Sequence, residues 1–333
     1  MAPKNLFAPL SIVLSFTTLA LFLLSLSIGP SQISALDAGA ALFGPLSDPT
    51  TLVMREIRLP RALLGAIIGA TLGLSGAVLQ GFLRNPLAEP GLLGVSASAS
   101  LGAVIAIYTG ISATFALALP VFALISAFCA IVILLSISGR DSRTLTVILT
   151  GIAITSLAGA LTALALNLSP NPFAAMEIMF WMMGSLTDRS IQHFWVILPF
   201  TLVGWVMLFS TAKALDALTL GPATAASMGY DLKRIQLLAI LGTALAVGSA
   251  TAVSGAIGFI GLIVPHLLRH LVGNRPSQLL PVSALGGASL LMAADILVRV
   301  IAPERDIKLG VVTALIGAPF FICLVWTHRG AKL

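Results

Sequence analysis

The sequence predicts an all-α integral membrane protein with about ten transmembrane helices. Of its 333 residues, 58% are hydrophobic and 9% are charged, whereas a soluble domain carries about 25% charged residues. The apolar residues form long unbroken runs instead of the apolar–polar alternation of membrane β-strands. No soluble core of this size could bury so much apolar surface, so the chain belongs in a lipid bilayer.

Ten apolar runs are candidate spans, because about 20 helical residues cross the hydrocarbon core of a bilayer. They are residues 6–28, 62–82, 92–109, 113–136, 145–166, 191–210, 235–254, 257–272, 279–300 and 309–327. The first is long for a cleaved signal peptide and lacks a small-x-small exit, which favours a span. The eighth is interrupted by Pro265, His266 and Arg269. In the long gap before the second span, residues 35–43 could form an interfacial helix.

The second predicted span has a row of glycines on one face. Gly65, Gly69 and Gly73 follow one another at intervals of four residues, which leaves one side of a helix almost without side chains. Another helix can then approach closely. We therefore expect this span to lie in the middle of the bundle.

The basic residues favour both termini in the cytoplasm. With the N-terminus inside, eleven of the 18 Lys and Arg residues fall in inner segments and seven in outer ones, as the positive-inside rule requires. This placement explains the net charge of +6 without a nucleic-acid partner. Arg55, Arg58 and Arg61 lie together on the outer side, against the rule. They either meet a partner surface or anchor a helix end in lipid headgroups, and the residues alone leave both open.

The inner loop between residues 211 and 234 contains a short predicted helix. Gly221-Pro222 can open a helix with proline in its first turn, residues 223–228 are small, and Gly229 is a typical helix stop. This helix would lie on the cytoplasmic face between two spans. It could fit a groove on a partner protein or be part of an ordinary loop.

The sequence lacks the motifs of an enzyme. It contains no phosphate-binding loop, no His-Glu-x-x-His, no Cys-x-x-Cys and no nucleophile elbow, so we predict no catalytic residue, metal or ATP site in this chain. His266 and His270 could share a metal, but a position beside Arg269 near the inner headgroups is favoured. Asp295 is the only candidate for a deep carboxylate. Because it precedes Arg299 by four residues, we expect an ion pair rather than a proton relay.

Several long motifs follow one another from about residue 50 to the C-terminus. They are Arg58-Leu-Pro-Arg61, Asn85-Pro-Leu-Ala-Glu-Pro-Gly-Leu-Leu-Gly-Val-Ser96, Gly221-x-x-x-Ala225-x-x-Met228-Gly229, Ser254-Gly-Ala-Ile-Gly-Phe-Ile-Gly-Leu-Ile-Val-Pro-His266, Leu280-Pro281, Ala294-Asp295 and Gly310-Val-Val-Thr-Ala-Leu-Ile-Gly-Ala-Pro-Phe320. Together they resemble the FecCD/BtuC-like permeases, which are membrane subunits of ABC importers for iron–siderophores, haem and vitamin B12. The resemblance implies one permease domain over residues 1–333. Residues 1–50 supply its first span and outer loop, and residues 51–333 its FecCD-like core.

The resemblance also implies an assembly in the bacterial inner membrane. Two permease subunits surround a central pore lined by the fifth and tenth spans. Two copies of one chain are favoured, and pairing with a related chain is the alternative, because the family uses both arrangements. Two cytoplasmic ATPase subunits bind ATP and Mg²⁺ and drive transport, so the permease binds no cofactor and is not an enzyme. A periplasmic or lipid-anchored binding protein delivers the cargo.

Site residues follow from the resemblance, position by position. The inner loop is similar to the family's ATPase-coupling segment, and the implied coupling residues are Leu220, Gly221, Ala225, Met228, Gly229 and Tyr230. The outer arginines Arg58, Arg61 and Arg299 resemble those that meet glutamates of the binding protein. A cytoplasmic gate is implied at Gly139, Arg140, Asp141 and Ser142. Two departures are Met228, where leucine is usual, and Pro222 beside Gly221.

The cargo is the least determined part of the prediction. An iron–siderophore-type chelate is favoured, because more members of the family carry such chelates, and cobalamin or haem is the alternative. The fifth and tenth spans contain no deep His or Tyr, which disfavours haem. A proton-driven secondary transporter is a remote alternative, because such carriers usually keep an ionisable group deep in a span.

Overall fold

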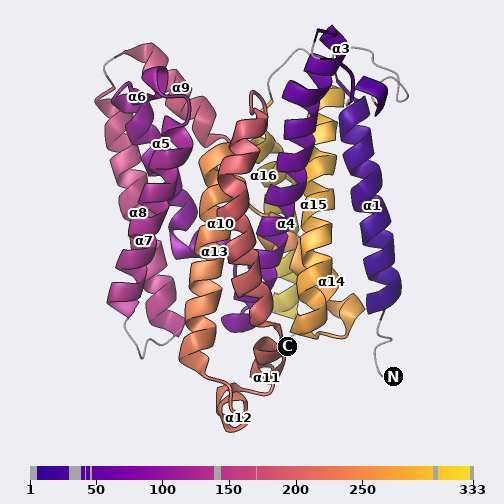
Figure 1. Ribbon diagram of the computed structural model, residues 1–333. Coiled ribbons are helices and arrows are strands. Elements are labelled where there is room, and N and C mark those ends of the chain that lie inside the picture. The colour runs from indigo at the N-terminus through magenta and orange to yellow at the C-terminus, as the bar shows by residue number, and fades with distance from the viewer. Residues whose placement is uncertain are drawn as a thin grey trace.

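The computed structural model describes residues 6–29, 39–41, 43–45, 47–138, 144–169, 171–302 and 307–330. Every regular element among them is helical, and the long helices run side by side in one bundle (Figure 1). Most of the interfacial helix predicted at residues 35–43 lies outside the described residues. So do all four residues of the predicted gate, Gly139, Arg140, Asp141 and Ser142.

Within the described residues, seven helices are long and apolar enough to cross a membrane, and each coincides with a predicted span. They are α1 (Phe7–Ser27), the continuous helix Pro49–Phe82, α7 (Ala118–Ser138), α8 (Thr144–Asn167), α10 (Ile191–Ser210), α13 (Leu232–Ser254) and α15 (Pro276–Ile301). The three other predicted spans correspond to α5 (Val95–Tyr108), α14 (Ile260–Arg269) and α16 (Leu309–Gly330). The all-α membrane fold is therefore confirmed.

Two of the predicted spans are broken. α5 has 14 residues and α14 has 10, which is about 21 Å and 15 Å of helix, so neither crosses a bilayer alone. Short 3-10 turns adjoin them, η2 (Pro90–Leu93) before α5 and η3 (His270–Val272) after α14. The eighth span, predicted at about residues 257–272, starts three residues later than predicted. Gly255 ends α13 with a φ of 70°, and α14 starts only at Ile260.

The second span starts earlier than predicted. The Asp48 carboxylate accepts hydrogen bonds from the backbone N–H groups of Thr50 and Thr51, and so caps a helix that begins well before residue 62. Three elements then follow without a break: α3 (Pro49–Leu52), the π-helical η1 (Val53–Arg58) and α4 (Leu59–Phe82).

The loop predicted between the fifth and sixth spans contains a helix, α9 (Pro172–Met182). The Asn171 side chain accepts a hydrogen bond from the N–H of Ala174 at 2.8 Å, and Pro172 occupies the first helical position. An asparagine cap followed by proline is a helix start signal, so the prediction of a loop here is wrong. α9 lies at the same end of the bundle as α3 and α6 (Ile111–Thr114) (Figure 1).

α4 is the central helix of the bundle, with 89% of its apolar window buried by other elements. A Cβ added at Gly69 would lie 2.8 Å from the Cα of Ala288, and one at Gly73 would lie 3.2 Å from the Cα of Gly287. The two helices α4 and α15 therefore touch backbone to backbone. Gly65 has more room, because its nearest neighbour is the flexible side chain of Met292 at 3.3 Å.

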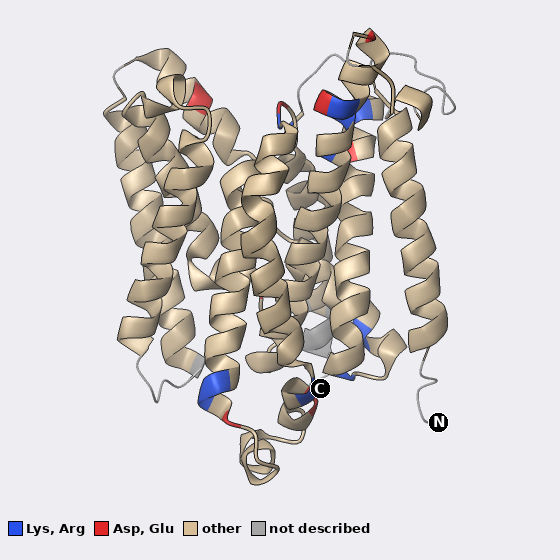
Figure 2. Cartoon of the chain, in the orientation of Figure 1, with Lys and Arg blue, Asp and Glu red and all other residues tan. Residues whose placement is uncertain are grey.

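The two ends of the bundle differ in what they carry. α1 begins and α16 ends at the end where the inner loop protrudes, opposite α3, α6 and α9 (Figure 1). This agrees with both termini in the cytoplasm. Charged residues gather at the two ends, and the middle of the bundle is nearly free of them (Figure 2), as expected for a chain that spans a bilayer.

Candidate functional site

Four charged residues meet at the outer end of the bundle, and we call Arg58, Arg61, Asp295 and Arg299 the outer arginine cluster. Asp295, in the last turns of α15, is only 2% exposed. Its Oδ1 lies 2.8 Å from Nη2 of Arg61 and its Oδ2 lies 3.0 Å from Nη2 of Arg299. The predicted ion pair between Asp295 and Arg299 is thus confirmed. The contact with Arg61 was missed, because no spacing rule connects α4 with α15.

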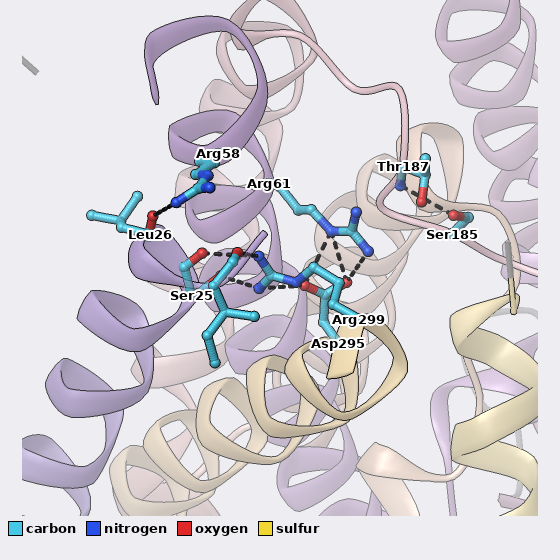
Figure 3. Close-up of polar contacts among 9 residues, drawn as sticks. Ser25, Leu26, Arg58, Arg61, Ser185, Thr187, Asp295 and Arg299 are labelled. Carbon is cyan, nitrogen blue, oxygen red and sulfur yellow. Dashed lines mark hydrogen bonds and ion pairs between the residues drawn. The ribbon is translucent and has the colours of Figure 1, made fainter. Parts of the chain in front are cut away.

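The arginines of this cluster also hold the end of α1 (Figure 3). Arg299 Nη1 donates to the carbonyls of Ser25 and Ile28 at 2.9 and 2.8 Å. Arg58 Nη1 donates to the carbonyls of Leu26 and Ser27 at 2.9 and 2.8 Å. The last carbonyls of a helix have no partner within it, and cations near a helix C-terminus are favourable. The cluster therefore fastens α1 to α4 and α15.

The docking role predicted for these arginines stays a prediction. Arg58 is only 3% exposed, and the side chains of Arg61 and Arg299 are 17% and 9% exposed. The hydrogen bonds and ion pairs described above lie within the subunit, so in this conformation these arginines offer little surface to another protein. Arg55, on η1 one turn before Arg58, is exposed. Of the arginines at positions 55, 58 and 61, Arg55 is the one whose side chain is exposed.

The inner loop forms two short helices, α11 (Ala212–Leu218) and α12 (Pro222–Ser227). Glycines with positive φ flank α12, Gly221 at 104° and Gly229 at 89°, where other residues would be strained. Pro222 occupies the first helical position, which suits a residue without an N–H. The predicted short helix is confirmed, and Pro222 does not disturb its first turn.

The tip of this loop is apolar and protrudes from the bundle (Figure 1). Leu220 is 65% exposed and Met228 is 56% exposed. Between them Ala225 is fully buried, and its carbonyl accepts the N–H of the half-buried Tyr230 at 3.2 Å. Large apolar side chains held out on a folded loop are suited to contact another protein.

The loop is connected to the membrane helices at several points. The Asp216 carboxylate accepts the backbone N–H of Ser277 in the first turn of α15 at 2.8 Å. Leu215 lies 3.5 Å from the position of a Cβ at Gly81, near the end of α4. Asp231 caps α13 by accepting the N–H of Lys233 at 2.9 Å. The loop therefore contacts three long helices, α15, α4 and α13. Sequence reasoning missed Asp216, because its partner lies 61 residues away.

The helices expected to line a pore present apolar side chains outward. Leu157 on α8 is 60% exposed, and Leu315 on α16 is 70% exposed. The sequence has no charged residue from Thr144 to Asn167 or from Leu309 to Trp326. His266 and His270 pack edge to face, with ring centroids 6.5 Å apart. Among the described residues, no group of three His, Cys, Asp or Glu side chains could hold a metal ion.

A multi-pass helical bundle with a folded apolar loop at its cytoplasmic end has the architecture of a transporter's membrane subunit. The profile of the FecCD transport family matches residues 17–327. The chain belongs to this family, whose members are multi-pass membrane permeases of ABC importers.

Known relatives carry several cargoes. The chain is 39% identical to the cobalamin import system permease BtuC of Halobacterium salinarum, over 84% of this chain and 74% of that one. It is 38% identical to the ferric enterobactin permease FepD of Escherichia coli, over 91% and 90%. A solved metal-chelate type ABC transporter in an inward-facing conformation superposes with a TM-score of 0.84 at 32% identity. That match covers 95% of this chain and 98% of that one.

Proposed function

We propose that this chain forms half of the pore of an ABC importer for an iron–siderophore-type chelate. The observation that carries the proposal is the inner loop: an apolar tip, exposed at Leu220 and Met228, connected through Asp216 and Asp231 to two membrane helices. This arrangement is suited to convert a movement of a cytoplasmic partner into a movement of the pore. A secondary transporter has no need of such a loop.

Two cytoplasmic ATPase subunits are the proposed partners at this loop. Leu220 and Met228 would enter a groove on the ATPase, while Gly221 and Gly229 allow the turns that hold α12 out. Ala225 and Tyr230 would support α12 from behind. ATP and Mg²⁺ would bind to the ATPase, and this chain would bind no cofactor and catalyse no reaction.

The second permease subunit is proposed to be another copy of this chain. The outward apolar faces of α8 and α16 need a cover, and lipid and a second subunit can both supply it. The proposed pore wall lacks charged residues from Thr144 to Asn167 and from Leu309 to Trp326. Such a wall has no strong site for a ligand, so cargo selection would belong to a periplasmic or lipid-anchored binding protein.

We retain Arg58, Arg61 and Arg299 as proposed docking residues for that binding protein. A glutamate of the partner could compete with Asp295 for Arg61, whose side chain is the most exposed of the three. Charge pairs of this kind set docking register and association rate more than affinity.

Cargo is proposed from similarity. The solved metal-chelate type transporter and the ferric enterobactin permease favour an iron chelate. Cobalamin is the second candidate, because the BtuC permease is equally similar. The test is uptake into proteoliposomes that contain this chain with its ATPase and binding protein. Ferric enterobactin, ferric citrate, haem and cobalamin would be offered in parallel.

We expect uptake of one iron chelate that requires both ATP and the binding protein. Uptake of cobalamin instead would show that cobalamin, and not an iron chelate, is the cargo. Uptake that follows a pH gradient without the ATPase would overturn the ABC importer assignment.

A further inference from the structure

A proline interrupts the hydrogen bonding of α14. Pro265 lies inside this helix, and proline has no N–H to donate to the carbonyl four residues earlier. The carbonyl that loses its helical partner is that of Gly261, which is buried. A buried carbonyl without a hydrogen bond is costly, so α14 needs a donor from outside the helix.

Gln80 supplies this donor. It lies in the last turn of α4 and is only 1% exposed. Its side-chain Nε2 donates to the carbonyls of Gly261 and Leu262, each at 3.2 Å. The amide of Gln80 therefore takes the place of the N–H that Pro265 lacks, and it does so from a neighbouring helix.

The same amide also binds the last residue of α14. Nη2 of Arg269 donates to Oε1 of Gln80 at 2.6 Å. A hydrogen bond with a charged donor is shorter and stronger than one between neutral groups. The amide side chain carries both a donor and an acceptor, and both are used here. Gln80 therefore connects α4 to the beginning and to the end of α14.

The backbones of α4 and α14 are in direct contact beside Gln80. A Cβ added at Gly76, one turn earlier on α4, would lie 2.6 Å from the Cα of Gly261. A Cβ added at Gly261 would lie 2.8 Å from the carbonyl oxygen of Leu72. This close approach brings the carbonyl of Gly261 within reach of Gln80. The two glycines and the glutamine therefore form one contact between the helices.

α14 in turn contacts α16, one of the two proposed pore helices. His266, directly after the proline, packs edge to face on Phe320 with ring centroids 6.0 Å apart. Phe259, directly before α14, fills the space beside Gly317, where an added Cβ would lie 2.6 Å from its Cδ1. The position of α14 therefore constrains where α16 can lie.

The inner loop contacts the same turn of α4. Leu215 on α11 lies 3.5 Å from the position of a Cβ at Gly81, the residue after Gln80. Leu215 also belongs to one apolar cluster with Val78 of α4, and Leu268 of α14 packs against that cluster. Side chains of the inner loop, α4 and α14 are therefore in contact around the end of α4.

We propose that Gln80 is a positioning residue of the permease: its amide replaces the missing N–H of Pro265, binds Arg269, and so holds α14 between the inner loop and α16. A proline break alone would leave α14 loosely attached. With Gln80 the broken helix moves together with the end of α4. The consequence for transport rests on the proposed coupling of the inner loop to an ATPase.

The first test is hydrogen exchange of α14 in the assembled complex without nucleotide, measured on peptides that cover residues 260–272. Gln80→Glu keeps an acceptor for Arg269, and the adjacent guanidinium keeps the carboxylate ionised, so this variant removes only the donor. Pro265→Ala restores a backbone N–H within α14. The two changes would be measured singly and together. Gln192→Glu, at an exposed glutamine on α10, is the matched control.

We expect Gln80→Glu to speed exchange of α14 roughly tenfold, the order expected when one buried carbonyl loses its donor. Pro265→Ala alone should not speed it. In the Pro265→Ala background Gln80→Glu should have little effect, because the carbonyl of Gly261 then has a partner inside its own helix. Where Gln80→Glu alone gives no folded complex, the double variant should recover it.

The second test is the amount of cargo taken up per ATP hydrolysed in proteoliposomes. Gln80→Glu should lower this ratio while ATP turnover continues, because α16 no longer follows the inner loop. A variant that is only less stable would lose uptake and ATP turnover together and keep the ratio. Pro265→Ala should restore the ratio of Gln80→Glu.

Three results would overturn the proposal. The first is wild-type exchange of α14 in Gln80→Glu. The second is a defect of Gln80→Glu that Pro265→Ala does not relieve, because the amide would then have another role. The third is a loosened α14 with an unchanged ratio, which would separate α14 from the pore. Failure of the proposed coupling looks different: wild-type uptake would not require ATP, while the exchange measurements would still decide the role of Gln80.

Discussion

The Asp295 carboxylate accepts hydrogen bonds from two nitrogens of Arg61, although the two residues lie 234 positions apart. Nη2 lies 2.8 Å from Oδ1 and Nε lies 3.1 Å from Oδ2. This contact joins α15 to α4 at the outer face. Arg299 occupies the remaining side of the same carboxylate. One buried aspartate therefore compensates two arginines, and its removal leaves both without their anion.

Asp295→Asn should destabilise the subunit by about 3 kcal/mol, the lower end of the range for breaking a buried charge pair, because Arg61 is partly exposed. The measurement is the thermal unfolding midpoint in detergent. Asp188→Asn changes an exposed aspartate at the same end of the bundle and should leave the midpoint unchanged. Equal midpoints for both variants would show that the cluster does not hold the helices together.

Replacing Arg58 and Arg61 together by glutamate should weaken docking of the binding protein. The effect should be larger at low salt, where exposed charges are less screened. Because Arg58 also binds the carbonyls of Leu26 and Ser27, the double variant should loosen the end of α1 as well. Titration with the binding protein measures the first effect, and hydrogen exchange of α1 measures the second.

Arg55→Glu separates the two effects. Arg55 is exposed, so this variant should reduce docking without changing exchange in α1. If the double replacement of Arg58 and Arg61 lowers the exchange protection of α1 without lowering the affinity for the binding protein, the role of both arginines is confined to fastening α1. Docking would then have to be assigned to other outer residues.

Gly69→Leu should prevent assembly of the bundle. Even a Cβ at this position would lie 2.8 Å from the Cα of Ala288 on α15, and backbone cannot move aside as a side chain can. Gly159→Leu on α8 is the matched control, because a Cβ there meets no atom within 4 Å. Expression level and size-exclusion chromatography of the two variants measure whether each one folds. A well-folded Gly69→Leu protein would contradict the central position of α4.

Gly229→Pro should abolish transport and cargo-stimulated ATP turnover. Gly229 has a φ of 89°, whereas proline is held near −65°, so the turn after α12 cannot form. Ala225→Leu should act in the same way by forcing α12 off the buried position of Ala225. Ser227→Ala, on the exposed side of α12, is the control. Persistent transport by Gly229→Pro would rule out the coupling role of the loop.

The sequence predicted the parts of the fold that depend on local patterns. Long apolar runs placed the spans, the glycines at Gly65, Gly69 and Gly73 placed α4 in the centre, and Gly221-Pro222 with Gly229 placed α12. The four-residue spacing of Asp295 and Arg299 predicted their ion pair. Each of these features needs only residues that are close together in the chain.

What the sequence could not show depends on contacts between distant residues. Neither the capping of α1 by Arg58 nor the bond from Ser277 to Asp216 has a local signal. The break at Phe259 was missed for a different reason. The run from 257 to 272 is apolar enough for a span, and nothing within that run signals the positive φ of Phe259.

α15 runs unbroken from the bond between Ser277 and Asp216 at the cytoplasmic end to Asp295 at the outer end. A continuous helix can transmit displacement in both directions, so binding at one face is coupled to binding at the other by a single coupling free energy. If ATP binding to an ATPase docked on the inner loop changes the affinity for the binding protein by some factor, the binding protein must change the affinity for ATP by the same factor. Equality of these two factors can be measured with this subunit before its cargo is known.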